Sequence, residues 1–274
     1  MKQFIINSAP DKDSVIRFEG DDYHYLVHVR RLAPGEYFPA LLPNNEEALV
    51  QVISIDNGAL TGKLSDSPPL SDSARSPANI PQIILFQALP KGDKMDMITR
   101  QAAEGGIAEI VPFVSEFSHG KTNIGREKFS RWQRIIKEAR QQSGSKTATA
   151  LSPPLAMDDL FVYWNKLKTA SSEPDILGLL FHHLPPRSDE KNLSGGLEQN
   201  SLHGYLNSNR KIVVLVIGPE GGFSGGEVSL FLKHGFFPLT IGNTVLRTET
   251  AALYCAAAIR ILLLERDSWE LRKK

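Results

Sequence analysis

The residues with the clearest chemical potential lie near the C-terminal end, at two places where an apolar run leads into a helix. In VLVIGPEGGFSGGEV, residues 214–228, five glycines fall within nine residues. Farther along, LTIGNTVLRTETAALY, residues 239–254, repeats the order strand, glycine, loop and helix, and carries Arg247 and Glu249. Glycines let a ligand approach backbone N–H groups, and a guanidinium stabilises an anion as it forms. The sequence therefore predicts a ligand site built from main chain beside these charges.

The elements around the first glycine cluster place it at the end of a buried strand. Ser224 followed by Glu227 is a capping box that begins a helix, and Gly235 suits its C-terminal end. Open α/β sheets bind ligands at the carboxyl ends of their strands. The spacing matches neither the phosphate-binding P-loop nor the dinucleotide fingerprint. A tight turn explains this cluster alone equally well, so the second loop is what favours a ligand.

The order of predicted strands and helices differs between the two parts of the chain, which predicts two domains. Short strand-like runs with one helical piece, residues 21–31, predict a small N-terminal β-barrel. Later, apolar strands alternate with helices, which predicts an α/β domain with a parallel sheet. Between them, Ser65 to Pro81 contains five serines and four prolines, a composition typical of a linker. We expect domains at residues 1–70 and 82–274, a linker at 71–81, and a polar loop or insertion at 185–200.

Composition argues against a disulfide-bonded secreted protein and against a membrane-spanning one. The 274 residues are 41% hydrophobic and 23% charged, with a net charge of zero, which is ordinary for a globular protein. The single cysteine, Cys255, favours a reducing compartment and reads as a small buried side chain. The N-terminus lacks the apolar core of a signal peptide, and the longest uncharged apolar run, Ala251 to Ile259, is too short to span a bilayer. We expect a soluble cytoplasmic protein.

The motifs IGPEGGFSGGEV and IGNTVLRTETAAL, taken together and in this order, resemble those of the bacterial ribosomal RNA uridine-N3 methyltransferases. This family belongs to the SPOUT class of S-adenosylmethionine enzymes and acts on small-subunit rRNA. The resemblance extends to HVRRLAPGE, residues 28–36, and to ALPKGDKMDMITRQAAEGGIAEIVPFVSE, residues 88–116.

This resemblance implies a PUA-like N-terminal barrel that helps to hold RNA, and a C-terminal SPOUT-type α/β domain with a trefoil knot. Pattern rules alone do not suggest a knot, because knots are nearly absent from proteins. The family also implies a homodimer and S-adenosylmethionine as methyl donor. Carried over residue by residue, three loops form the donor site: Leu180, Phe181 and His182; Gly218, Pro219, Glu220, Gly221 and Gly222; and Ile241, Gly242, Leu246 and Arg247.

Methyl transfer to uridine N3 needs positioning and loss of the N3 proton. Arg247 is the candidate to stabilise the imide anion. Glu249 is a base, holds Arg247, or is simply an acidic residue favoured at a helix N-terminus. His182 and His183 have no partners at metal-ligand spacing, so we expect no metal.

A basic segment predicts contact with RNA. Residues 119–146 contain eight Lys and Arg against two Glu, a net charge of +6, and Phe129, Trp132 and Ile136 at helical spacing predict one buried face. By contrast, residues 1–75 contain seven basic and eleven acidic residues, a net charge of −4, so RNA contact there must be local. The candidate RNA-binding residues are Arg30, Arg31, Lys121, Arg126 and Arg134.

The chain also departs from the family pattern. Arg100-Gln101 and Gly105-Gly106 replace Gln-Lys and Leu-Gly, Phe117 and Thr244 stand where an arginine is expected, and QQSGS, Gln141 to Ser145, lacks the arginine that ends the family's run. Two alternatives therefore stay open: a SPOUT methyltransferase with another RNA target, and an RNA-binding relative without catalysis. The alanines of the last helix, among them Ala252 and Ala256, favour either a dimer interface or close core packing.

Overall fold

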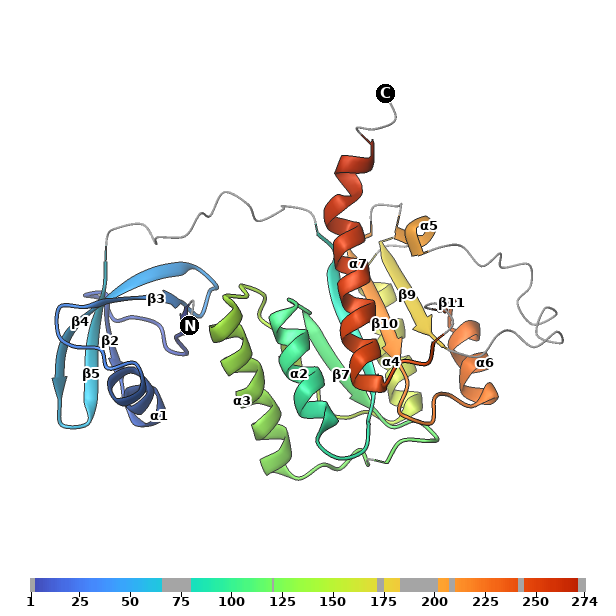
Figure 1. Cartoon of the computed structure of the whole chain (residues 1–274), viewed down its shortest axis with the longest axis horizontal. Helices are drawn as coiled ribbons and strands as arrows, with labels where there is room; N and C mark the ends of the chain where they lie inside the picture. Colours follow the sequence, from blue (N-terminus) through green and yellow to red (C-terminus); the bar gives the residue numbers. More distant parts are fainter. Residues whose placement is uncertain are drawn as a thin grey trace. The chain divides into compact units, whose positions relative to one another are not determined.

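The structure is a computed structural model that describes residues 3–65, 80–119, 121–171, 175–182, 202–206, 210–240 and 244–270, with side chains as far as residue 265. The chain divides into two compact units (Figure 1). The first comprises Met1–Ser76 with Lys137–Ala148, and the second comprises Pro77–Ile136 with Thr149–Lys274. Most of the expected linker and all of residues 185–200 lie outside the described residues.

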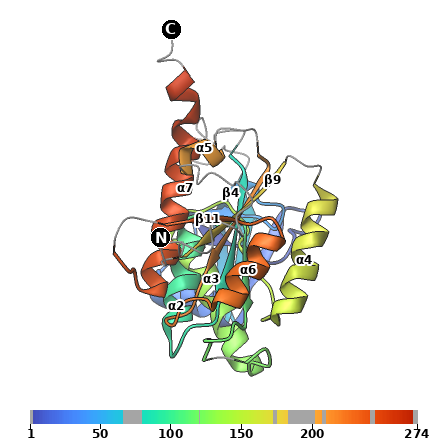
Figure 2. The same ribbon diagram turned by 90° about the vertical axis from the view of Figure 1, so that its right-hand side faces the viewer.

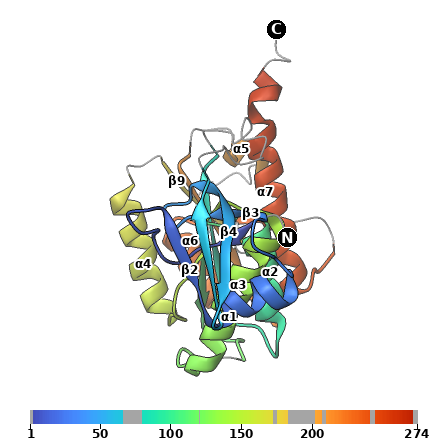
Figure 3. The ribbon, with the colours of Figure 1, turned by 90° about the vertical axis from the view of Figure 1, so that its left-hand side faces the viewer.

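The first unit contains the expected small β-structure (Figure 3). Its five strands are β1 (Phe4–Ile5), β2 (Val15–Phe18), β3 (Tyr37–Leu41), β4 (Glu47–Asp56) and β5 (Ala59–Leu64), in the order β1-β3-β4-β5-β2. The helical piece is also confirmed, as α1 (Gly20–Tyr23) followed by a π-helical segment, η1 (His24–Val29). Strands β4 and β5 meet at Asn57 and Gly58, which both have positive φ, as the tightest hairpin turns require.

The core of this unit is aromatic. Phe4, Phe18 and Phe38 are buried and contact one another edge to face, with ring centroids 5.7 to 6.0 Å apart. Leu26 of η1 is fully buried in the same cluster. The alternation of these apolar side chains along short strands is therefore what builds the barrel-like unit.

The second unit is the predicted α/β domain with a parallel sheet. Its strands are β6 (Gln82–Ala88), β7 (Glu109–Phe113), β8 (Ala150–Leu151), β9 (Ile176–Phe181), β10 (Ile212–Ile217) and β11 (Phe237–Leu239), in the order β11-β9-β10-β6-β7-β8. Every pairing is parallel. The carboxyl ends of β9, β10 and β6 therefore lie side by side.

Helices cover both faces of this sheet (Figure 2). Helices α4 (Met157–Ala170) and α6 (Gly225–Lys233) lie on one face, where Trp164 and Phe231 pack against strand side chains. Helices α2 (Lys94–Glu104) and α7 (Thr248–Glu270) pack against each other on the other face. The remaining helices are α3 (Arg126–Ser143) and the short α5 (Leu202–Leu206).

Three local predictions are confirmed. The Ser224–Glu227 capping box is present, and Gly235 follows α6 with φ of +85°. In α3, Trp132 and Ile136 are buried and Phe129 is half-buried. Helix α4 and strand β8 were not anticipated. None of the described helices is long and apolar enough to cross a bilayer.

The trefoil knot stays a prediction. It depends on the path of the chain around residues 241–243, and these lie outside the described residues.

Candidate active site

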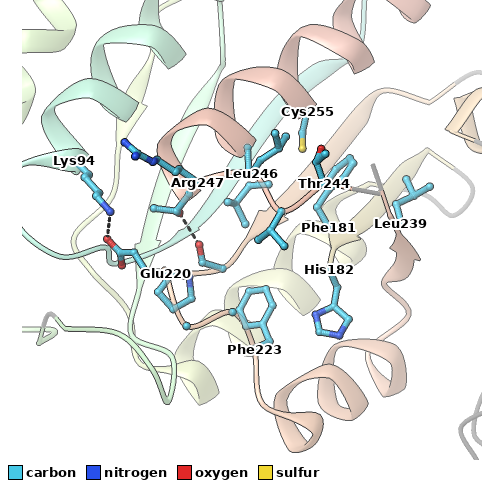
Figure 4. A pocket seen from close by; sticks show the side chains of 18 residues that line it. Lys94, Phe181, His182, Glu220, Phe223, Leu239, Thr244, Leu246, Arg247 and Cys255 are labelled. Atoms are coloured by element: carbon cyan, nitrogen blue, oxygen red, sulfur yellow. Dashed lines mark hydrogen bonds and ion pairs between the residues drawn. The ribbon is translucent and has the colours of Figure 1, made fainter. Parts of the chain in front are cut away.

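A cavity of about 520 Å³ opens at the carboxyl ends of β9, β10 and β11 (Figure 4). This volume is within the range of about 300–1,000 Å³ that ligand pockets occupy. Its walls come from the end of β9, the glycine-rich loop after β10, the end of β11, the segment just before α7 and the first turns of α7, with Lys94 from α2. The lining residues are Lys94, Phe181, His182, Ile217, Gly218, Pro219, Glu220, Gly221, Gly222, Phe223, Leu239, Thr244, Val245, Leu246, Arg247, Thr248, Ala251 and Cys255.

Most of the residues expected at a donor site meet in this cavity. Phe181 and His182, the five residues 218–222, Leu246 and Arg247 all line it. Leu180 does not, because its side chain is fully buried in the core beneath α4 and α6. Ile241 and Gly242 lie outside the described residues.

The fold itself explains why two positions of the loop after β10 are glycine, apart from any approach of a ligand. Gly222 has φ of +71°, and its N–H donates to the carbonyl oxygen of Pro219 at 2.9 Å, which closes a tight turn. A Cβ on Gly221 would lie 2.8 Å from the Cβ of Phe117, closer than two carbon atoms can approach. Even without a ligand, a side chain at Gly221 would therefore clash with Phe117, and one at Gly222 would strain the backbone.

Glu220 ties this loop to the region that follows β6. Its carboxylate accepts hydrogen bonds from the Lys94 ammonium at 2.6 Å and from the backbone N–H of Lys91 at 3.1 Å. Burial opposes the charge of Glu220, but the hydrogen bonds from Lys94 and backbone N–H groups outweigh it and lower its pKa. The hydrogen bond to Glu220 in turn raises the pKa of Lys94. The pair is therefore fully charged at neutral pH.

Thr248 forms a second tie, between the same loop and α7. Its hydroxyl donates to the carbonyl oxygen of Gly218 at 2.6 Å and accepts from Nε2 of Gln87 at 3.1 Å. Gln87 is fully buried at the end of β6, and its Nε2 also donates to the carbonyl oxygen of Ala88. One hydroxyl thus fixes the start of α7 against the ends of β10 and β6.

The charges beside the cavity cluster at one end. Arg247 is exposed there, and Lys94 and Glu220 lie at the same end (Figure 4). One carboxylate oxygen of Glu249 lies 3.7 Å from the Lys94 nitrogen, and the described residues show no ion pair between Glu249 and Arg247. Within the same described residues, no group of His, Cys, Asp and Glu could hold a metal ion.

Several lining residues were not anticipated from sequence. Lys94 follows β6, which neighbours β10, so the shared sheet edge could have indicated it. Cys255 lies seven residues after Thr248 in α7, hence on the same helix face. Burial raises the pKa of its thiol to about 12.

The expected RNA-binding residues fall in both units. Arg30 and Arg31 follow η1 in the first unit, with Arg31 in the left-handed region at φ of +57°. Lys121 and Arg126 are exposed before and at the start of α3, and Arg134 is exposed on the same helix.

Comparison with known protein families identifies the class of protein to which this chain belongs. The family of RNA methyltransferase domains matches residues 76–260, and the family of RNA methyltransferase PUA domains matches residues 18–65. This agrees with a glycine-lined cavity in a parallel α/β unit that follows a small β-unit.

Individual relatives narrow the class. A ribosomal RNA small subunit methyltransferase E of Synechocystis sp. is 30% identical, over 93% of this chain and 76% of that protein. One of Borreliella burgdorferi is 27% identical, over 96% and 98%. The crystal structure of the Neisseria gonorrhoeae enzyme bound to S-adenosyl methionine has the same fold, with a TM-score of 0.71 at 20% identity over 96% and 98% of the two chains. The chain belongs to the ribosomal RNA small subunit methyltransferase E family.

Proposed function

We propose that this protein transfers the methyl group of S-adenosylmethionine to N3 of a uridine in small-subunit ribosomal RNA. The observation that carries the proposal is the cavity at the carboxyl ends of β9, β10 and β11, where a glycine-rich backbone meets Arg247 in a chain of this family. The Neisseria gonorrhoeae relative, which binds S-adenosyl methionine, supports the choice of donor. We also propose that the protein works in the cytoplasm.

The cavity fits such a donor in size and chemistry. Its walls combine apolar side chains such as Phe181, Leu239 and Phe223 with the backbone of Gly218 to Gly222. An adenine ring and a ribose are uncharged, so they suit apolar walls and backbone hydrogen-bonding groups better than a cluster of charged side chains. We propose that Phe181, His182, Gly218 to Gly222, Ile241, Gly242, Leu246 and Arg247 hold it.

The chain's own residues then act by position and charge. S-adenosylmethionine supplies an electrophilic methyl group, so the protein needs no covalent intermediate. The N3 proton passes to water, N3 takes the methyl group, and S-adenosylhomocysteine leaves. Arg247, exposed at the charged end of the cavity, stabilises the negative charge that the uracil oxygens gain when that proton is lost. Within the described residues Arg247 forms no ion pair, which supports this role because a guanidinium held in an ion pair would be less available.

The contacts of Glu249 favour one of the roles that its position in the sequence allows. Its 3.7 Å contact with Lys94 favours holding that cation, which in turn binds Glu220 and so the glycine-rich loop. To accept a proton, Glu249 would have to leave Lys94. We therefore propose that Glu249 holds Lys94 in place.

We propose that RNA is held by Arg30 and Arg31 in the first unit and by Lys121, Arg126 and Arg134 in the second. Exposed basic side chains at the start of α3 can neutralise phosphates without reading sequence.

One assay separates this function from its alternatives. Purified protein and S-adenosylmethionine are incubated with small ribosomal subunits from a strain that lacks the methyltransferase gene, and the rRNA nucleosides are analysed by mass spectrometry. N3-methyluridine supports the proposal. Another methylated nucleoside indicates a SPOUT enzyme with a different target, and none at all leaves an RNA-binding relative without catalysis.

We further propose that the protein works as a homodimer through α7. Cys255 and Ile259 of this helix are buried, but Tyr254, Ile261 and Leu264 are 54%, 52% and 49% exposed. An apolar hollow of about 170 Å³, lined in part by Ala256 and Ala257, lies between α7 and α2 where the two helices pack together. A second copy of the same helix is apolar enough to cover this surface.

Sedimentation velocity tests the dimer. We expect the wild-type protein to sediment as a dimer and Ile261→Asp as a monomer, because a carboxylate in an apolar interface is strongly unfavourable. Val162→Asp is the matched control, since Val162 is 53% exposed on α4, on the opposite face of the sheet. A monomeric wild-type protein, or a dimeric Ile261→Asp variant, would contradict the proposal.

A further inference from the structure

Phe117 lies in a turn that is fixed on both sides. The N–H of Ser118 donates to the carbonyl oxygen of Ser115 at 3.0 Å, and the N–H of Ser115 donates to Oγ of Ser118 at 3.1 Å. The N–H of Glu116 donates at 2.8 Å to the carboxylate of Glu227, a buried residue that also caps α6. The turn after β7 is therefore tied to the same helix start as the glycine-rich loop.

The side chain of Phe117 lies against Gly221. A Cβ placed on Gly221 would be 2.8 Å from Cβ and 3.2 Å from Cγ of Phe117, so the glycine makes room for this side chain. Gly221 lines the cavity and directly follows Glu220, which marks its charged end. Phe117 is nevertheless 44% exposed, whereas Phe113 and Phe223 nearby are buried. The protein thus holds an exposed aromatic side chain in a fixed place beside the candidate active site.

We propose that Phe117 is a stacking surface for the target base. This inference rests on the proposed function. A uridine whose N3 is to react must leave its place in the RNA, and the stacking it loses is commonly replaced by aromatic side chains. A phenyl ring offers neither charge nor hydrogen-bonding groups, so it suits the face of a base and not a phosphate. At this position the family resemblance leads us to expect an arginine, and this chain has an uncharged ring instead.

Charge favours RNA over a second protein chain as the partner of Phe117. The part of the chain that closely follows Phe117 carries the exposed basic side chains Lys121 and Arg126. An exposed ring followed closely along the chain by exposed cations matches a base joined to its phosphates. The exposed apolar residues of α7 already offer a separate surface for a second copy.

The test compares Phe117→Leu with Phe117→Trp. Leucine keeps an apolar contact with Gly221 but has no ring, whereas tryptophan keeps an aromatic ring, and a larger one than phenylalanine has. Methyl transfer to small ribosomal subunits is measured as a function of RNA concentration. Since stacking holds the base equally in the ground and transition states, we expect the KM for RNA to rise on the order of 10-fold in Phe117→Leu with little change in kcat. We expect Phe117→Trp to keep the wild-type KM. The control Val162→Ala, an exposed apolar change on α4, should also leave this KM unchanged.

Two further measurements make the outcome specific. Calorimetric titration with S-adenosylmethionine is expected to give the same affinity for both variants and the wild type, and sedimentation the same mass. An unchanged KM in Phe117→Leu overturns the proposal, and so does a change in mass, which would identify Phe117 as a contact between protein chains.

Failure of the proposed function is a separate result. If the wild-type protein methylates no RNA, the same variants are compared by fluorescence anisotropy for binding of a short uridine-rich single-stranded RNA. Weaker binding by Phe117→Leu, with recovery in Phe117→Trp, upholds stacking without catalysis. Equal binding by all three proteins overturns it.

Discussion

Replacing Thr248 by valine removes one hydroxyl and nearly nothing else. The two side chains have the same shape, so the packing at the start of α7 is preserved. The carbonyl oxygen of Gly218 loses a donor at 2.6 Å, and Nε2 of Gln87 loses one of its two acceptors. Because Gln87 is fully buried, water cannot replace the missing contact there.

The expected size follows from these contacts. Leaving a buried polar group unsatisfied costs about 1–3 kcal/mol, so we expect the free energy of unfolding to fall by that amount. If half of this cost concerns the arrangement of the Gly218 loop against α7, affinity for S-adenosylmethionine falls by about 2- to 10-fold. Denaturant unfolding measures the first quantity and calorimetric titration the second. Thr248→Ser is the control, because it keeps the hydroxyl.

Coupling to Gln87 sharpens the test. The double variant Gln87→Leu, Thr248→Val should lose less stability than the sum of the two single variants, because both remove the same hydrogen bond. Strict additivity, or a Thr248→Val protein with wild-type stability and donor affinity, would refute the idea that this hydroxyl joins the two loops.

Other expectations concern charge and reactivity. Arg247→Ala should slow methyl transfer by about 100-fold or more, the scale of losing one donor to a developing anion, and near-normal turnover would remove Arg247 from that role. Glu220 has a pKa below its ordinary 4.5, so its contribution to stability is complete above that pH and is lost as pH falls through the lower folded value. The stability difference between wild type and Glu220→Gln should therefore shrink in acid, and a difference that is independent of pH would contradict the Lys94 pairing. Cys255 is 1% exposed with a pKa raised by burial to about 12, so iodoacetamide at pH 8 should modify it in denaturant and not in the folded protein, as read by intact mass.

Periodicity and turn chemistry predicted most of the fold because they are local. Continuous apolar runs such as β10 and the capping box of α6 need no knowledge of the rest of the chain. Helix α4 was missed although Leu160, Phe161 and Trp164 recur along one face of it. Its neighbour β8 has two residues, too few to show a period.

The candidate site was partly predictable for the same reason. The glycines and Arg247 stand in recognisable runs, whereas Gln87 reads as one more residue of a strand. Its contact with Thr248 joins residues 161 positions apart, and such a contact depends on the order of strands in the sheet. Lys94 was missed likewise, since its partner Glu220 is 126 positions away.

Arg247 directly precedes α7, and Thr248 and Glu249 are its first two residues; each of the three contacts a different part of the fold. Successive helical residues point about 100° apart, so neighbours face different elements. Arg247 lines the cavity, Thr248 binds the ends of β10 and β6, and Glu249 faces Lys94 of α2. Inserting a single residue ahead of Ala251 would turn these side chains relative to the buried face of α7, and would break the hydroxyl tie and the Lys94 contact together. The order Arg-Thr-Glu is therefore fixed by the geometry of one helical turn among three neighbours, and a change at any one of these positions is expected to act through a different element.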